Sequence, residues 1–147
     1  MKLTRQGHAF TEIVLETFKF SGLLTTEGDR ITQIYGLSSA RWKIIGALER
    51  SDTALTVPQI ARVMGQSRQA VQRLVDSMHK EGLLVFIDNP KHKRAKLISL
   101  AIDGKKVYTT LQQQQVPWAN KHSSEIDEKE LEITLATLKK LSEKFAL

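Results

Sequence analysis

The fold is decided by residues 56–82, which read TVPQIARVMGQSRQAVQRLVDSMHKEG. Thr56 has the side chain of a helix N-cap. Pro58 falls in the first turn, where its missing N–H removes no helical hydrogen bond. Gly65 then follows the last apolar residue and is typical of a helix end. These signals predict a short helix over residues 57–64 that stops at a tight turn.

A longer helix follows this turn, because Ser67 can act as its N-cap and Gly82 as its terminator. Its side chains separate into two stripes on opposite sides, both with helical spacing. The apolar stripe comprises Val71, Leu74, Val75 and Met78, and the polar stripe comprises Gln69, Gln72, Arg73 and Asp76, with Arg68 beside it. A short helix, a tight turn and a longer helix with one polar face predict a helix-turn-helix.

The spacing of the apolar residues is no longer helical after Gly82. Residues 83–87 and 95–100 are short β-prone runs, and residues 88–94 between them are rich in turn-forming and basic residues. Two strands flanking such a loop predict a β-hairpin, or wing. The expected fold class is therefore mainly α with a small β-hairpin: a winged helix-turn-helix with helical segments on either side.

The polar stripe suits the edges of DNA bases. A major groove about 12 Å wide admits one α-helix, whose amides can pair with adenine and whose guanidinium groups can pair with guanine. A polar helix face alone is more often a solvated surface. The basic wing that follows it favours DNA, because cations there can lie along phosphates and place an arginine in the minor groove.

Composition limits the other functions. The chain has 147 residues, a formal net charge of +6 and a pI near 9.7, which favours a polyanionic partner. It has no cysteine, and its four histidines are dispersed, so we expect no disulfide, thiolate or metal site. No nucleophile–base pair or carboxylate cluster indicates an enzyme. Charged residues interrupt the apolar positions near the N-terminus, so we expect no signal peptide, no membrane span and a cytoplasmic protein.

The segments on either side of this unit are predicted to be helical. Residues 10–35 carry an apolar stripe weakened by glycines, which fits one long bent helix or two shorter ones. Asp103 is expected to cap a helix that Pro117 kinks or interrupts. Asp127 is expected to start the last helix. Either these apolar faces pack on the chain's own core or they self-associate.

Several stretches resemble the MarR family of bacterial regulators between about Leu37 and Lys105. The stretches that carry the resemblance are LSSARW at 37–42, SRQAVQRLV at 67–75, KEGLL at 80–84 and RAKLISL at 94–100. The resemblance implies a dimer whose N-terminal helix and last two helices self-associate. It also implies a palindromic operator read by two recognition helices about 34–36 Å apart.

The resemblance also assigns roles to residues. Residues 67–73 would face the major groove, and Arg94 would enter the minor groove. The family's usual wing has an Asp two residues before this Arg, and this chain has His92 there. The acid that would hold Arg94 is therefore missing, unless Asp88 substitutes for it. Ala101 likewise replaces the family's usual Thr. The expected DNA-binding residues are Ser67, Arg68, Gln69, Gln72, Arg73, Lys91, Lys93, Arg94 and Lys96.

Many members of this family are released from DNA by a small, often aromatic molecule bound between the dimerisation helices and the DNA-binding lobe. The aromatic residues that could line such a pocket are Phe10, Tyr35, Trp42, Tyr108 and Trp118. The expected organisation is a dimerisation segment over 1–36, a DNA-binding domain over 37–102 and a second dimerisation segment over 103–147. We expect a repressor; the alternative is a winged-helix module that binds a protein partner.

Overall fold

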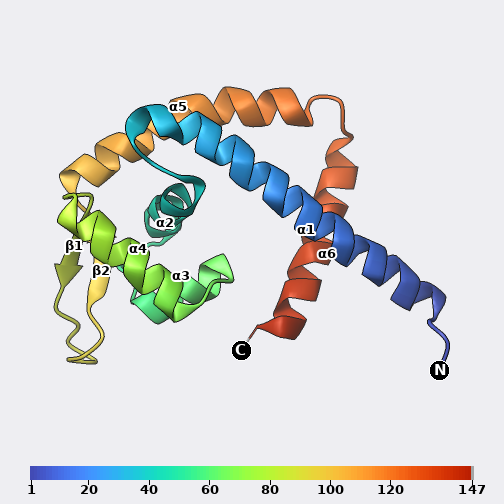
Figure 1. Ribbon diagram of the computed structural model, residues 1–147, viewed down its shortest axis with the longest axis horizontal. Helices are drawn as coiled ribbons and strands as arrows, with labels where there is room; N and C mark the ends of the chain where they lie inside the picture. Colours follow the sequence, from blue (N-terminus) through green and yellow to red (C-terminus); the bar gives the residue numbers. More distant parts are fainter. Residues whose placement is uncertain (147) are drawn as a thin grey trace.

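The computed structural model describes residues 1–146 and contains helices and one small hairpin, which lies at one edge of the molecule (Figure 1). The elements in chain order are α1 (Arg5–Thr32), η1 (Gln33–Tyr35), α2 (Ser39–Arg50), α3 (Val57–Met64), α4 (Arg68–Lys80), β1 (Leu84–Ile87), β2 (Leu97–Leu100), α5 (Ile102–Ser123) and α6 (Glu128–Phe145). This is the expected class: mainly helical, with a winged helix-turn-helix between N- and C-terminal helices.

The helix-turn-helix has the predicted bounds. Thr56 caps α3 as part of a capping box with Gln59, and Pro58 lies in the first turn. Gly65 has a φ of 63°, in the left-handed region, so the chain can turn tightly after α3. Ser67 then caps α4 by accepting a hydrogen bond from the backbone N–H of Ala70 at 3.1 Å. These local contacts fix where both helices begin.

The hairpin is antiparallel and pairs Leu84 with Leu100 and Ile87 with Leu97. Leu55, in the segment before α3, forms an isolated bridge with Ile98 on β2. The wing is thereby attached to the helical unit. One core joins them, and its most deeply buried members include Ile44, Ile45, Ile60, Val71, Val75, Met78, Leu84 and Ile98.

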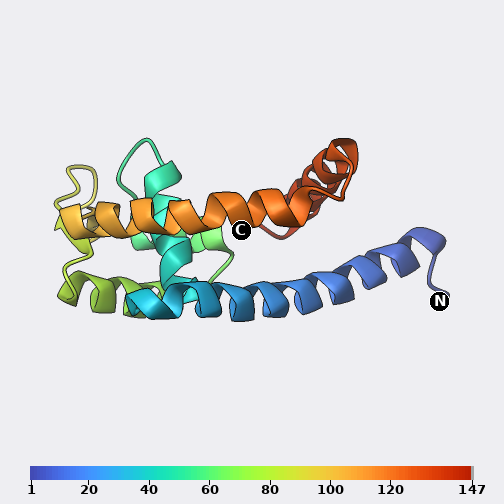
Figure 2. The ribbon, with the colours of Figure 1, turned by 90° about the horizontal axis from the view of Figure 1, so that it is seen from above.

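The helices outside this unit extend away from it. Helix α1 is one continuous helix with a gentle curve rather than two short ones, and its N-terminus lies far from the wing (Figure 2). Helix α5 starts beside the hairpin and runs roughly alongside α1 in Figure 2, and α2 contacts both helices. Pro117 lies inside α5, which is not interrupted there. Helix α6 follows α5 and has no buried residue.

One predicted helix cap is wrong. Asp103 does not cap α5; it lies in the first turn, and the N-cap is Ala101, whose side chain makes no capping hydrogen bond. The N–H of Ala101 instead donates to the carbonyl oxygen of Leu83 at 2.9 Å. This contact with the segment before β1 determines where α5 starts, which local sequence signals could not indicate.

Candidate nucleic-acid interface

The polar stripe of α4 faces solvent. Each of the five helix residues predicted to bind DNA is exposed, whereas Val71, Val75 and Met78 on the opposite side are fully buried. The five are Ser67, Arg68, Gln69, Gln72 and Arg73. The helix therefore uses one face to hold its position and leaves the other free. Apart from the helix cap Ser67, these side chains are long and polar, as base recognition in a groove requires.

Arg41 on α2 holds the C-terminal end of α4. Its Nη2 donates to Oγ of Ser77 at 2.8 Å, and its Nη1 contacts Oε2 of Glu81 at 2.5 Å. The guanidinium thus bridges one helix to the last turn of the other, which limits how α4 can rotate. Sequence reasoning missed this role, because the partners are 36 and 40 residues away.

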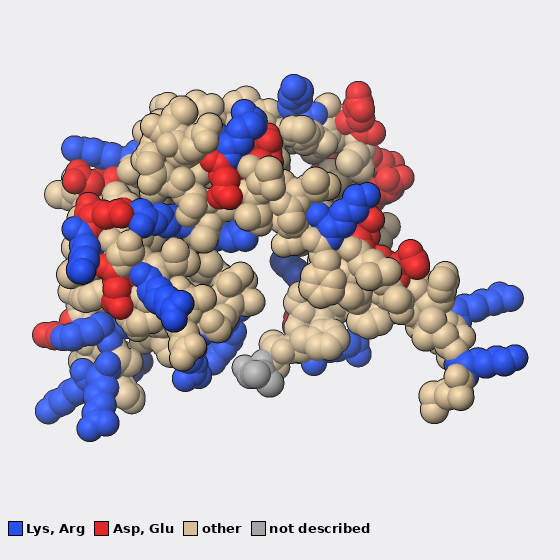
Figure 3. Space-filling view, in the orientation of Figure 1, with Lys and Arg blue, Asp and Glu red and all other residues tan. Residues whose placement is uncertain are grey.

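The wing carries the other four predicted residues, all exposed: Lys91, Lys93, Arg94 and Lys96. Lysine and arginine side chains gather over the hairpin tip, at the lower left of Figure 3. The loop is shaped by its backbone, since the N–H of His92 donates to the oxygen of Asn89 at 3.2 Å and Ala95 donates to His92 at 3.2 Å. The tip therefore presents several cations on a structured turn.

Asp88 does not hold Arg94. Its carboxylate contacts the ammonium group of Lys96 across the base of the wing. This hydrogen bond, with the charge of Lys96, lowers the pKa of Asp88 below its ordinary value. Within the described residues, Arg94 makes no side-chain hydrogen bond or ion pair. Lys96 is therefore partly neutralised, while the guanidinium of Arg94 is available.

A pocket of about 310 Å³ lies where α1, α2 and α5 meet. Three of the five aromatic residues predicted for a pocket line it, namely Trp42, Tyr108 and Trp118, and Phe10 and Tyr35 do not. Sequence reasoning did not anticipate its charged lining residues. Those residues are Glu27, Lys43 and Arg50.

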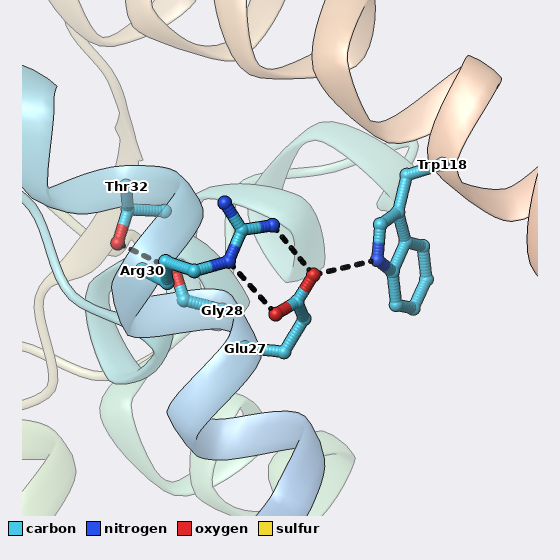
Figure 4. Close-up of polar contacts among 5 residues, drawn as sticks. All are labelled: Glu27, Gly28, Arg30, Thr32 and Trp118. Carbon is cyan, nitrogen blue, oxygen red and sulfur yellow. Dashed lines mark hydrogen bonds and ion pairs between the residues drawn. The ribbon is translucent and has the colours of Figure 1, made fainter.

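Glu27 connects α1 to α5 at this pocket (Figure 4). Its carboxylate accepts two hydrogen bonds from Arg30, at 2.9 and 2.7 Å, and one from Nε1 of Trp118 at 3.2 Å. The Arg30 hydrogen bonds are the main reason that the pKa of Glu27 falls to about 2; Trp118 lowers it further, and partial burial opposes both. The contact therefore joins the two helices through an ionised carboxylate.

No helix of the described chain is long and apolar enough to cross a membrane.

Sequence comparisons identify relatives along most of the chain. A profile of the MarR family matches residues 35–95. An uncharacterised protein of Mycobacterium tuberculosis is 31% identical over 129 residues, which cover 88% of this chain and 89% of the relative. The transcriptional activatory protein BadR of Rhodopseudomonas palustris is 26% identical over 101 residues, covering 67% of this chain and 58% of BadR.

Solved structures share the fold. A MarR/EmrR family regulator from Acinetobacter has a TM-score of 0.79 at 22% identity, covering 97% of this chain and 98% of that one. MepR of S. aureus, solved with DNA, has a TM-score of 0.77 at 18% identity, covering 89% and 96%. CouR of Rhodococcus jostii, bound to p-coumaroyl-CoA, has a TM-score of 0.78 at 17% identity, covering 88% and 91%.

The fold, with an exposed polar helix and a basic wing, defines a winged helix-turn-helix protein of the DNA-binding class. The profile match over residues 35–95 and the shared fold identify the winged helix-turn-helix of this chain as that of the MarR family, whose members are transcriptional regulators and not enzymes.

Proposed function

We propose that this protein is a dimeric repressor that binds a palindromic operator and is released by a small molecule. The observation that carries the proposal is the pairing of an exposed polar face on α4 with an exposed basic wing. In this proposal residues 37–102 bind DNA, and residues 1–36 and 103–147 hold the dimer together.

The proposed DNA contacts are of two kinds: contacts with base edges and contacts with the sugar-phosphate backbone. The exposed residues among 67–73, at the start of α4, read bases in the major groove, since Gln69, Gln72 and Arg73 carry the donors and acceptors that base edges match. Lys91, Lys93 and Lys96 grip phosphates, and Arg94 enters the minor groove, where a free guanidinium suits the negative potential. The free side chain of Arg94 supports this role despite His92, because no contact within the described residues has to break first.

Self-association is supported by apolar residues that α1 and α6 leave exposed. They include Phe18, Phe20 and Leu23 on α1, and Leu131, Ile133, Leu135 and Leu138 on α6. Leu131, Leu135 and Leu138 recur at helical spacing and share one face of α6, and an exposed apolar face is typical of an interface between proteins. A second copy would cover it and set the distance between the two α4 helices.

The pocket between α1, α2 and α5 is the proposed effector site. Its aromatic walls suit a ring, and its cations suit an acidic group on that ring. Arg50 donates to the carbonyl of Gly46 at 3.0 Å and has no acidic partner among the described residues. Both tryptophans of the chain line this pocket, so benzoate binding would quench their fluorescence, and the neutral analogue benzamide would quench it less.

The test uses a fragment that contains the protein's own promoter. We expect Arg94→Ala to weaken binding in fluorescence anisotropy, and Gln69→Ala or Arg73→Ala to relax sequence preference. Wild-type affinity should fall steeply with salt, with a log–log slope of about −0.9 per phosphate contacted. Unchanged binding by all three variants would contradict the assigned site. A flat salt response would favour a protein partner.

In vitro transcription from the same fragment determines the sign of regulation. We expect the dimer to reduce transcription, because an operator that overlaps the promoter excludes the polymerase. BadR is named as an activatory protein, so activation of transcription is the direct alternative. Increased transcription would contradict the repressor assignment and leave the DNA contacts unaffected.

A further inference from the structure

Gln72 and Asp76 lie one turn apart on the exposed face of α4. The amide Nε2 of Gln72 donates to Oδ1 of Asp76 at 2.9 Å. Gln69 and Arg73, on the same face, make no side-chain hydrogen bond within the described residues. Gln72 is therefore held in one orientation before DNA arrives, and its two neighbours are not.

Asp76 has two cations within reach along the helix. Arg73 precedes it by three residues and Lys80 follows it by four, and side chains at both spacings are neighbours on a helix surface. Neither forms an ion pair with Asp76 among the described residues. The carboxylate instead binds the neutral amide, and the guanidinium of Arg73 stays free.

The hydrogen bond decides which atoms Gln72 presents. An ionised carboxylate only accepts hydrogen bonds, so the amide nitrogen of Gln72 must face Asp76. The carbonyl oxygen and the second N–H remain for a base. A neighbouring acceptor and donor match N6 and N7 of adenine, whereas guanine offers two acceptors at the same edge. An amide without this restraint could turn and donate to guanine.

A carboxylate on this face also has an electrostatic cost. Its negative charge opposes the approach of phosphates and so weakens binding to every sequence. We propose that Asp76 is a positioning residue that gives Gln72 its preference for adenine. The proposal rests on the proposed function, in which α4 reads the major groove. Asp76 then lowers the affinity for every DNA sequence and raises the discrimination between adenine and guanine.

The test compares full-length wild type with Gln72→Ala, Asp76→Ala, Asp76→Asn and the double variant Gln72→Ala/Asp76→Ala. A randomised duplex library, selected and sequenced, locates the base pair at which Gln72→Ala changes the preference. At that base pair, we expect Asp76→Ala to lower the adenine-to-guanine affinity ratio about five-fold or more, the low end for one bidentate contact. The double variant should lower this adenine-to-guanine ratio no further than Gln72→Ala alone does.

The affinity for unrelated DNA should change in the opposite direction. Asp76→Ala removes a negative charge, so we expect tighter binding to a duplex without the operator. Asp76→Asn removes the same charge but keeps an acceptor oxygen, so it should retain more of the adenine preference than Asp76→Ala. Glu49→Ala, an exposed charge change on α2, should leave the base preference unaltered.

Three outcomes would overturn the positioning role. They are an unaltered adenine preference in Asp76→Ala, a loss spread evenly over all operator positions, and a Gln72→Ala variant with wild-type preference. Each of these leaves the proposed function standing if wild type still selects a sequence and Arg94→Ala still weakens binding. Wild type without any selective binding would overturn both.

Discussion

Gly28 and Ser39 are in direct contact where α1 crosses the start of α2. A β-carbon on Gly28 would lie 2.1 Å from Oγ of Ser39, closer than a β-carbon approaches an atom to which it is not bonded. Ser39 is buried, its hydroxyl donates to the carbonyl of Thr25 at 2.7 Å, and its backbone N–H donates to Asp29 at 2.7 Å. This crossing fixes the long N-terminal helix onto the DNA-binding unit.

Gly28→Ala should therefore destabilise the protein, although alanine normally favours a helix. The added methyl group must push α1 from α2 or break the Ser39 hydrogen bonds, and overpacking of this kind typically costs about 1–3 kcal/mol. Chemical denaturation followed by circular dichroism measures the loss. Gly22→Ala is the matched control, because nothing lies within 4 Å of its β-carbon; it should gain about 0.5–1 kcal/mol. Equal effects of the two substitutions would contradict the crossing.

The Glu27–Trp118 hydrogen bond should survive mild acid. The folded pKa of Glu27 is about 2, below the ordinary glutamate value of 4.5, so the bond stabilises the fold above that ordinary value and is lost as pH falls through about 2. The chain has two tryptophans, so its NMR spectrum has two indole N–H signals. We expect the Trp118 signal to show no titration step near pH 4.5.

Three variants identify this signal and test its cause. Trp118→Phe should remove it, and Glu27→Ala should shift it towards the position of an indole in water. Glu27→Gln keeps an acceptor oxygen but loses the charge that pairs with Arg30, so it should shift the signal less than Glu27→Ala. A Trp118 signal that titrates in wild type near pH 4.5 would mean that Glu27 is not held by Arg30.

The helix-turn-helix could be predicted because its determinants are local. Thr56 and Ser67 cap backbone N–H groups three residues away, so spacing alone indicated both helix starts. Contacts between segments far apart in the sequence could not be predicted in this way. Glu27 and Trp118 are 91 residues apart, and the packing of both α1 and α5 against α2 brings them together. The start of α5 was misplaced for the same reason, since the Ala101–Leu83 hydrogen bond determines it.

The candidate site divides in the same way. The exposed face of α4 follows from helical periodicity, so every residue placed on it from the sequence is exposed. The ion pair of the wing does not follow from any periodicity. Asp88 could face Arg94 or Lys96, and the strand register, which pairs Ile87 with Leu97, brings the base of the wing together and favours Lys96.

Asp88→Asn should increase affinity for DNA. The carboxylate of Asp88 neutralises part of the charge on Lys96, and its lowered pKa keeps this pair ionised at and below neutral pH. Without it, the full charge of Lys96 is available to a phosphate, so the salt slope should become steeper, by about 0.9 at most. Salt titration by fluorescence anisotropy measures both changes. Asp52→Asn, an exposed acid before α3, should raise affinity without the steeper slope. An unaltered slope in Asp88→Asn would mean that the Asp88 ion pair does not limit the contact of Lys96 with phosphate.

A charge on the exposed apolar face of α6 should separate the proposed dimer. Leu135 is 55% exposed and Phe18 on α1 is 72% exposed, so neither stabilises the single chain much by burial. Leu135→Glu and Phe18→Glu should each shift sedimentation velocity from a dimer to a monomer, because an interface would have to bury an unpaired carboxylate. Ile102→Glu is the control, since Ile102 is 76% exposed at the opposite end of α5.

Operator binding should fall with the dimer. A monomer offers one α4 to a palindrome that spans two half-sites, so both interface variants should bind the full operator weakly while keeping wild-type helicity by circular dichroism. Ile102→Glu should remain dimeric. If Leu135→Glu and Phe18→Glu both stayed dimeric, the subunits would have to meet through another surface. If they were monomeric and still bound the full operator with wild-type affinity, the two α4 helices would not act together.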